Sequence, residues 1–440
     1  MIMSQSKRSR NPDHVRPLQR PSPPNEVIEA RIKSLLSSAV ISQGAYYRGL
    51  GLRDRLLNLP VMVASVLMLL WRQVPSVHEL TRLIAREDLF WRGPVKVSQQ
   101  ALDKRFLSFP AALFERVFLA IVPKLQQRSL ERKRPLPRSV VQAKTCFEQI
   151  YVVDGSTLEA LFRKLKALQE GPRERLAGKI VTVVDLVTRL PVHLWFTPSP
   201  HRHDASYTDE ILALSKPRTL WIFDRGFYDF GFFYALMDQG SAFITRLKAN
   251  AVFTVEEELL ISDQVRDRLI RLRDGRHVLR LVEVRFGTTW HRYLTSVLDP
   301  RHLSAQTVAD LYRRRWRIEE AFLTVKRLLG LSYLWTGSEN GVLLQLWATW
   351  LFFGVLVDLS DEVADRLMVP FDRISLEMVF RGLYHFMRAY ERGEASDPVA
   401  YLSSEENRDL GVVKRKRGKR RGSEPDQADE NWALLALDSL

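Results

Sequence analysis

The stretch from Leu311 to Lys326 constrains this chain more than any other. It reads Leu-Tyr-Arg-Arg-Arg-Trp-Arg-Ile-Glu-Glu-Ala-Phe-Leu-Thr-Val-Lys, contains neither Gly nor Pro, and is rich in strong helix formers. It is therefore predicted to be a helix. At about 100° per residue, four of its polar side chains fall within roughly 60° of each other on the helix surface. These side chains are Tyr312, Arg315, Glu319 and Lys326.

The same helix carries a separate apolar stripe, made of Leu311, Ile318, Phe322, Val325 and Leu329. Four charged side chains point elsewhere: Arg313, Arg317, Glu320 and Arg327. One carboxylate thus shares a narrow stripe with two cations and a phenol, at the border of the buried face. A metal-binding acid flanked by phosphate-binding groups would have this arrangement. The alternative is an ordinary amphipathic surface helix whose Arg and Glu side chains pair at helical spacing.

Composition adds a second constraint. The 440 residues allow two or three domains, and 46% hydrophobic residues support a large core. The net charge of +15 favours a polyanionic partner, most simply nucleic acid, although charge can also serve solubility. The single Cys146 excludes a disulfide framework and a multi-cysteine zinc site. The polar, Pro-rich start lacks the pattern of a signal peptide.

Two aspartates upstream of the helix share a setting. The apolar run Ile150–Val153 leads into Asp154, and the apolar run Thr219–Phe223 leads into Asp224. Each Asp also precedes a nearby Gly, which suggests a turn. Continuous apolar runs are typical of buried strands, and functional groups collect beyond the carboxyl ends of such strands. The alternative is that each Asp caps a turn or a helix.

The order of patterns predicts an α/β protein with several parts. We expect a disordered basic arm over 1–24, a helical DNA-binding domain over 25–142, a catalytic domain over 143–335 with a β-rich insertion at 250–303, C-terminal helices over 336–395 that complete the core, and a disordered tail with a basic run over 396–440.

Two segments need a separate interpretation. The helix predicted over Ser98–Leu107 follows a short break and is polar and basic, which suits a DNA-reading element, although many helical bundles look the same. The apolar segment Gly341–Val357 is slightly short for a membrane span of about 20 residues. We expect it to be a buried core helix, and no membrane association is predicted.

Three carboxylates with basic neighbours suit phosphoryl transfer. Two Mg²⁺ ions can activate a water or a 3′-hydroxyl and stabilise the leaving oxygen, and Mg²⁺ prefers a few carboxylates. Asp154, Asp224 and Glu319 would supply that set, and Arg315 and Lys326 would neutralise the phosphate under attack.

The chain resembles the DDE transposases of bacterial insertion sequences, specifically the insertion sequence 4 family. The resemblance covers about residues 145–335, and less sharply the helical region before them. It is carried by three pieces: Val153-Asp154-Gly155-Ser156, Phe223-Asp224-Arg225-Gly226-Phe227-Tyr228-Asp229, and Tyr312-x2-Arg315-x3-Glu319-x6-Lys326. The last piece matches the family's Y-R-E-K signature at every spacing, whereas Glu320 falls outside it.

The resemblance implies a ribonuclease-H-like catalytic core with a β-rich insertion before the glutamate helix. Asp154, Asp224 and Glu319 would hold two Mg²⁺ ions, for which Mn²⁺ can substitute. The side chains of Tyr312, Arg315 and Lys326 would contact DNA phosphates near the scissile bond. Trp290 is a candidate for stacking on a flipped base, although a plain strand Trp that packs on a neighbour fits it equally well.

The implied activity is that of a DNA transposase in the bacterial cytoplasm, associated with the nucleoid. It would bind the ends of its own element, cleave the double-stranded DNA and join it to target DNA, as a homodimer in the synaptic complex. Two rival interpretations stay open. One is a metal-dependent nuclease without strand transfer, and the other is a non-catalytic DNA-binding derivative.

Overall fold

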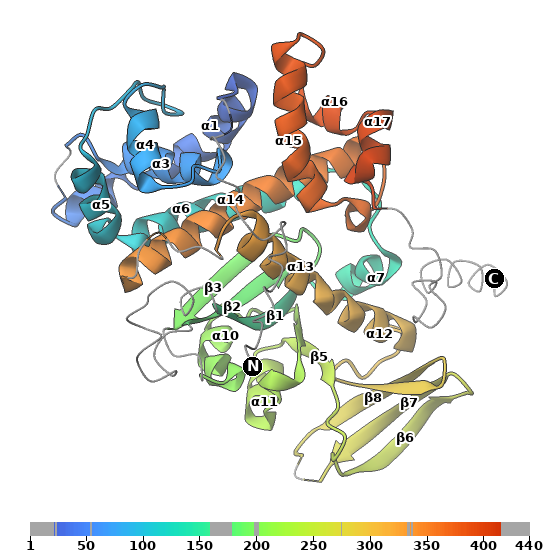
Figure 1. The fold of residues 1–440 in the computed structure, drawn as a ribbon. Helices are drawn as coiled ribbons and strands as arrows, with labels where there is room; N and C mark the ends of the chain where they lie inside the picture. Colours follow the sequence, from blue (N-terminus) through green and yellow to red (C-terminus); the bar gives the residue numbers. More distant parts are fainter. Residues whose placement is uncertain are drawn as a thin grey trace, which may run out of the picture.

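One mixed β-sheet organises the molecule (Figure 1). The computed structural model describes residues 22, 24–52, 55–158, 178–197, 202–273, 275–331, 335 and 338–414. Within these residues the sheet has nine strands in the order β3-β2-β1-β4-β5-β9-β8-β7-β6. The strands are β1 (Gln149–Leu158), β2 (Gly178–Asp185), β3 (Pro191–Thr197), β4 (Thr219–Phe223), β5 (Ala242–Arg246), β6 (Phe253–Ile261), β7 (Val265–Leu272), β8 (Val278–Phe286) and β9 (Thr289–Thr295).

The centre of the sheet is parallel and its flanks are antiparallel. Strand β1 pairs in parallel with β4, with Val153 opposite Phe223, and β4 pairs in parallel with β5. The hairpin of β2 and β3 pairs antiparallel with β1. All five residues of β4 are buried, as expected of a strand covered on both faces.

The β-rich insertion continues this sheet. Strand β9 pairs antiparallel with β5, with Ile244 opposite Thr295, and β8, β7 and β6 follow outward. Strands β7 and β8 form an antiparallel hairpin, and Asp274, which lies between them in sequence, is outside the described residues. Strands β6 to β9 are therefore joined to the central strands by backbone hydrogen bonds.

The two faces of the sheet carry different cores, because successive side chains of a strand point to opposite faces. Val153 and Phe223 belong to a cluster with residues of α10 (Thr208–Leu214) and α11 (Phe230–Asp238). Val152 belongs to a larger cluster on the other face, which includes residues of the N-terminal and C-terminal helices.

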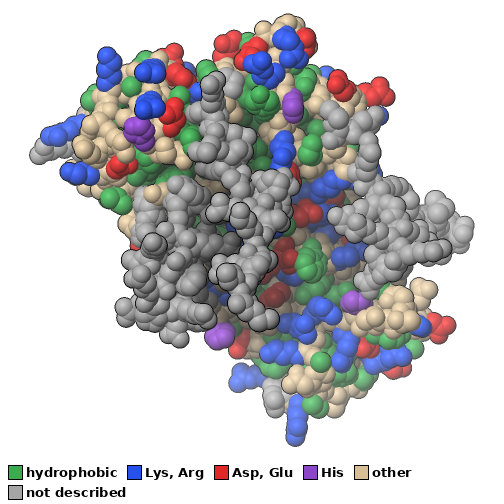
Figure 2. Space-filling model, viewed as in Figure 1, with side chains coloured by type: hydrophobic (Ala, Val, Ile, Leu, Met, Phe, Trp, Pro, Cys, Tyr) green, Lys and Arg blue, Asp and Glu red, His purple; other side chains and the backbone are tan. Residues whose placement is uncertain are grey.

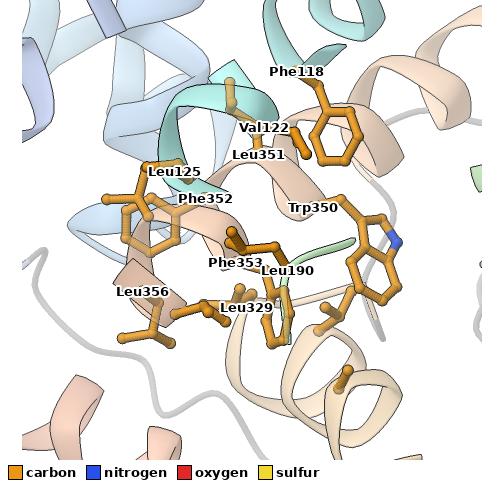
Figure 3. Close-up of a cluster of buried hydrophobic side chains, with 14 of the residues drawn as sticks. Phe118, Val122, Leu125, Leu190, Leu329, Trp350, Leu351, Phe352, Phe353 and Leu356 are labelled. Atoms are coloured by element: carbon orange, nitrogen blue, oxygen red, sulfur yellow. The ribbon is translucent and has the colours of Figure 1, made fainter. Parts of the chain in front are cut away.

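Helices before and after the sheet share that larger cluster. They are α1 (Glu26–Ile41), α2 (Gly44–Gly49), α3 (Leu59–Trp71), α4 (Val77–Ile84), α5 (Gln99–Ser108), α6 (Ala111–Glu131), α7 (Arg138–Cys146), α14 (Glu339–Arg366), α15 (Leu376–Glu391) and α16 (Pro398–Leu402), and the short α17 (Glu405–Asn407) follows them. Figure 3 shows side chains of α6 and α14 packed together, with Leu190 of the β2–β3 turn and Leu329 against them. The domain boundaries predicted at 142 and 335 stay predictions.

Helix α14 contains the apolar segment whose environment was in question. It is long and apolar enough to cross a membrane, but 94% of its most apolar window is buried inside the molecule. Its second half also carries Asp358 and Asp361, which pair with arginines of the α6 region. The predicted buried core helix is thus confirmed.

Two predictions about chain organisation were wrong. The strand that contains Asp154 does not end there, because β1 continues to Leu158 and pairs with β2 over that length. The disordered tail predicted from 396 does not begin there, because α16 and α17 follow with Val399 and Leu402 buried. The basic arm over residues 1–21 and residues 415–440 of the tail lie outside the described residues.

Candidate active site

The two aspartates lie side by side on neighbouring parallel strands. Val153 of β1 is opposite Phe223 of β4, so Asp154 and Asp224 are the next residues on strands about 4.8 Å apart. Asp224 begins the 3-10 turn Arg225–Phe227, and its Oδ1 accepts a hydrogen bond of 2.6 Å from the Gly226 N–H. The Oδ1 of Asp154 accepts one of 2.8 Å from the Gly155 N–H. Strand pairing therefore brings together two carboxylates that are 70 residues apart in sequence.

The glutamate helix is continuous but not uniform. It consists of α12 (Ala305–Arg313), a 3-10 turn (Arg314–Trp316), α13 (Arg317–Leu323) and a π-helical turn (Thr324–Leu328). The uniform helix predicted for this stretch is thus corrected, because its hydrogen-bond spacing changes twice. All residues of the predicted apolar stripe are buried, as expected. Short 3-10 and π segments inside helices are frequent at functional sites.

Arg315 connects this helix to the sheet. Its Nη1 donates a 2.5 Å hydrogen bond to Asp154 Oδ2, and its Nη2 donates one of 3.2 Å to Glu319 Oε1. The guanidinium carbon also lies 5.9 Å from the centre of the Tyr312 ring. Arg315 is buried at 8% exposure, whereas the Glu319 side chain is 36% exposed. The arrangement brings Tyr312, Arg315 and Glu319 together beside Asp154, as the polar stripe predicts.

Lys326 contacts strand β1 further along. Its Nζ donates hydrogen bonds to Ser156 Oγ, at 2.5 Å, and to the Thr157 carbonyl oxygen, at 2.8 Å. Lys326 therefore lies at the same strand as Asp154, two to three residues beyond it. Its cation is on the side of the helix that faces β1, together with Arg315 of the polar stripe.

The pKa of Asp154 depends on its burial and on the charges of the neighbouring site residues. Burial raises the pKa of Asp154 from 3.8 to about 6, the charge of Arg315 opposes this rise, and the charges of Asp224 and Glu319 add to it. Burial lowers the pKa of Arg315, but the charges of Asp154 and its other acidic neighbours outweigh burial, so this pKa is raised. The carboxylates thus repel one another, and a cation between them relieves that repulsion.

The fit to a divalent metal can be judged from the donor set. Carboxylate oxygens of Asp154, Asp224 and Glu319 are the hard ligands that Mg²⁺ prefers. In the described arrangement, however, the Arg315 guanidinium lies between Asp154 and Glu319. Over the parts of the chain that the structure describes, no three Asp, Glu, His or Cys side chains converge closely enough to hold a metal ion. The chemistry of the donors fits the metal, and the three-ligand site stays a prediction.

Glu320 lies on another side of the helix. It pairs with Arg317 at 2.8 Å and with Lys414 at 3.4 Å. This agrees with its exclusion from the polar stripe. The neighbouring acids Glu319 and Glu320 thus have separate partners.

Trp290 lies in the insertion, on β9, where it is opposite Arg285 of β8. The guanidinium of Arg266 lies 4.5 Å from the centre of its ring. Strand β9 reaches the glutamate helix at Tyr293, whose ring centre is 5.3 Å from that of Tyr312. Trp290 is three residues away, about 10 Å along a strand. The packing on Arg266 matches the alternative of a strand Trp against a neighbour, and the role in base stacking stays a prediction.

Two charged residues that lie near the site were not identified from the sequence. Arg246 ends β5, and its positive charge partly offsets the rise in pKa that burial causes in Tyr293 and Tyr312. Asp204 lies close to both Gly155 and Gly226, the glycines that follow the two aspartates. Neither residue belongs to a spacing pattern that marks it, because only the fold brings it to the site.

Comparison with known proteins covers the same region. Residues 145–351 match the family described as the transposase DDE domain. The chain is 26% identical over 181 residues to a probable transposase for insertion sequence element IS5377 from Geobacillus stearothermophilus, a match that covers 40% of this chain and 47% of that protein. It is also 26% identical over 177 residues to the putative transposase y4zB from Sinorhizobium fredii, covering 37% and 48%.

The chain spans about half the length of these curated relatives. The matched region contains Asp154, Asp224 and Glu319 together with Arg315. Residues 145–351 are thus similar to a transposase DDE domain, and these similarities support a DDE transposase.

Proposed function

We propose that this protein is a DNA transposase that binds the ends of its own insertion sequence, cleaves the DNA by Mg²⁺-dependent phosphoryl transfer and joins it to target DNA. The observation that carries the proposal is the link between the sheet and the glutamate helix. Asp154 and Asp224 are neighbours on β1 and β4, and Arg315 joins Asp154 to Glu319. The transposase DDE domain match over the same residues supports it.

The proposed core is ribonuclease-H-like, and the proposed family is that of insertion sequence 4. The first is supported by the strand order β3-β2-β1-β4-β5, with an antiparallel hairpin beside parallel strands. The second is supported by the signature spacing from Tyr312 to Lys326 and by the β-strands β6 to β9 before the glutamate helix.

In this proposal each polar group has a defined role. Asp154, Asp224 and Glu319 would hold the metal ions, whose chemistry would be activation of the attacking hydroxyl and stabilisation of the leaving oxygen. Arg315 holds the Asp154 and Glu319 carboxylates in place until DNA is bound, and then stabilises the phosphate. Lys326 contributes a second positive charge from the β1 side, and Tyr312 donates a hydrogen bond to a phosphate oxygen.

The partner is double-stranded DNA, both as element ends and as target, and the synaptic complex is a homodimer in the bacterial cytoplasm. The net charge of +15 supports a polyanionic partner. In Figure 2, Lys and Arg side chains are numerous over the lower part of the molecule, where Figure 1 places β6 to β8. Exposed arginines of this region are Arg266, Arg273, Arg276 and Arg285.

The test uses the purified protein, a duplex that carries the element end, a precut version of that duplex and a target plasmid. A transposase cleaves the first duplex at the element boundary with Mg²⁺ and joins the precut end to the plasmid. Cleavage without joining would favour a nuclease. Specific end binding without metal-dependent cleavage under any condition would favour a non-catalytic DNA-binding protein.

A further inference from the structure

A fourth carboxylate, that of Asp204, lies behind the two aspartates of the site. Asp204 begins the 3-10 turn Asp204–Tyr207, which packs against the turn that follows Asp224. Its side chain is 22% exposed, and its Oδ1 lies 2.6 Å from the Nζ of Lys179 on β2. Lys179 in turn donates a 3.0 Å hydrogen bond to the Arg202 carbonyl oxygen. The position of the Asp204 carboxylate is therefore fixed by an ion pair to the sheet.

Two glycines leave the space that this carboxylate occupies. A Cβ atom on Gly155 would collide with Asp204 Oδ1, and one on Gly226 would lie 2.9 Å from Asp204 Oδ2. Neither glycine has a positive φ, so backbone conformation does not require Gly at these positions. The requirement at Gly155 is room for Asp204 and Lys179, and at Gly226 it is room for Asp204 and Asp224, because real Cβ atoms do not approach other atoms so closely.

Asp204 approaches the sheet from the face opposite the glutamate helix. Gly155 and Asp154 are successive residues of β1, so they point to opposite faces. Asp154 faces Arg315, while Gly155 faces the side that holds Val153 and Tyr207. The contact of Asp204 is thus with the backbone that carries the catalytic aspartates, not with the phosphate side of the site.

We propose that Asp204, held by Lys179, is a positioning residue that sets the separation of Asp154 and Asp224. It contacts the β1 backbone at Gly155 and the turn after β4 at Gly226, one residue and two residues beyond the respective aspartates. Ligand positions must be held within a few tenths of an ångström for a metal site to retain its affinity. The consequence for catalysis rests on the proposed transposase function.

The first test compares Asp204→Ala and Asp204→Asn with Asp209→Asn, a matched control at an exposed position in the first turn of α10. Mn²⁺ binding is measured by electron paramagnetic resonance on the full chain, and end binding by gel shift. We expect Asp204→Ala to weaken Mn²⁺ binding about 10- to 100-fold, as changes to groups that support metal ligands do, and Asp204→Asn to weaken it less. End binding and the Asp209→Asn variant should be unchanged. Unchanged Mn²⁺ affinity in Asp204→Ala would overturn the proposal.

The second test measures the contact itself, through the melting temperature and Mn²⁺ affinity of Gly155→Ala, Asp204→Ala and the double variant. If Asp204 occupies the space in front of Gly155, Gly155→Ala is harmful alone and much less harmful with Asp204→Ala. Equal harm in both backgrounds, in melting temperature and in metal affinity, would contradict the proposed contact.

The two hypotheses fail differently. A wild-type protein that neither binds Mn²⁺ nor cleaves DNA would defeat the proposed function, while the melting temperatures of the double-variant set would still report on the contact. If the wild-type protein and Asp204→Ala cleave with the same dependence on Mg²⁺ concentration, the positioning role is wrong and the proposed function is unaffected. If Gly155→Ala does not fold, the single Asp204 variants decide the question.

Discussion

Two clusters of buried acids and arginines in this molecule have opposite characters. One joins α14 to the α6 region, and the other is the candidate active site. In the first, Asp361 accepts hydrogen bonds from Ser129 (2.7 Å), Arg132 (2.7 Å) and Arg134 (3.1 Å). In the second, one guanidinium, that of Arg315, serves two carboxylates, and the pKa of Asp154 remains raised to about 6.

The difference separates a cluster whose charges are compensated within the fold from one whose acids are not. A buried acid with several charged donors is compensated, and loss of one partner leaves an uncompensated charge that typically costs about 3–5 kcal/mol. An acid beside other acids has a raised pKa, so the folded protein keeps a site that favours an added cation. The predictions below test whether the two clusters differ in this way.

The largest effect is expected for Glu319→Gln. It should reduce cleavage by about three orders of magnitude or more, because a ligand to the metal ions is lost while end binding uses other surfaces. Cleavage kinetics and gel shifts on the element end would measure both quantities. A variant that cuts at the wild-type rate would remove Glu319 from the site.

Asp361→Ala tests the compensated cluster. It should lower the free energy of unfolding by about 3–5 kcal/mol, since Arg134 then remains buried without its acid, while Arg132 keeps its ion pair with Asp358. The matched control is Glu362→Ala, whose side chain is 35% exposed and whose loss should cost less than about 1 kcal/mol. Urea denaturation gives both values, and equal losses would show that the two acids do not differ.

Asp154→Asn tests the candidate active site through the pH dependence of the free energy of unfolding. The pKa of Asp154 rises from 3.8 to about 6 on folding, so the carboxyl binds its proton more tightly in the folded state. Its contribution to stability is therefore fully present below about pH 4 and is lost as the pH rises through about 6. The shift corresponds to a contribution on the order of 3 kcal/mol.

The measurement is urea denaturation of metal-free wild-type protein and Asp154→Asn at pH 5 and pH 7.5. The variant lacks this titration, so its stability relative to the wild type should be higher at pH 7.5 than at pH 5. Comparison of the two pH values removes the constant cost of losing the hydrogen bond to Arg315. Parallel pH dependences would mean that Asp154 titrates normally.

Lys326→Ala should slow cleavage about 10- to 100-fold, the effect of losing one charge-assisted hydrogen bond to a phosphate. Mn²⁺ binding should be retained, because Lys326 is not a metal ligand. Arg327→Ala, at the exposed neighbouring position, is the control and should have little effect. Loss of Mn²⁺ binding in Lys326→Ala would count against a phosphate role.

The smallest effect is expected for Trp290→Ala. The family that the chain resembles can excise its element through a DNA hairpin, in which a flipped base stacks on an aromatic ring of the insertion. If the Trp290 ring stacks on that base while the DNA hairpin forms, its loss should cost about 1 kcal/mol, or roughly fivefold in rate. The stacking role is dropped if hairpin formation is intact. Arg266→Ala, which removes the cation over the same ring, is the matched control for packing inside the insertion.

Much of the site was predictable, because its parts are local patterns joined by simple rules of sheet geometry. The run Thr219–Phe223 is the strand predicted from its apolar residues, and Asp224 ends it. The polar stripe of the glutamate helix depends only on helical spacing. These features follow from neighbours in sequence, and so does the buried environment of α14.

The features that sequence missed depend on contacts between distant segments. Gly155 suggested a turn that ends the strand, yet β1 continues through it, because its residues stay paired with β2 as far as Leu158. Nothing in the local sequence of Asp204 or Lys179 marks their approach to the site. The 3-10 and π turns of the glutamate helix also escaped prediction, since single changes of hydrogen-bond spacing leave little trace in an amphipathic pattern.

The π turn at Thr324–Leu328 makes the length of this segment as important as its side chains. A π turn accommodates one residue more than an α turn, so deletion of a single residue there would allow ordinary α geometry. The wider turn absorbs the extra residue, so the residues on either side of it would keep nearly the same faces of the helix after such a deletion. Relatives of this protein should therefore tolerate the loss of one residue in this turn better than the loss of one residue elsewhere in the glutamate helix.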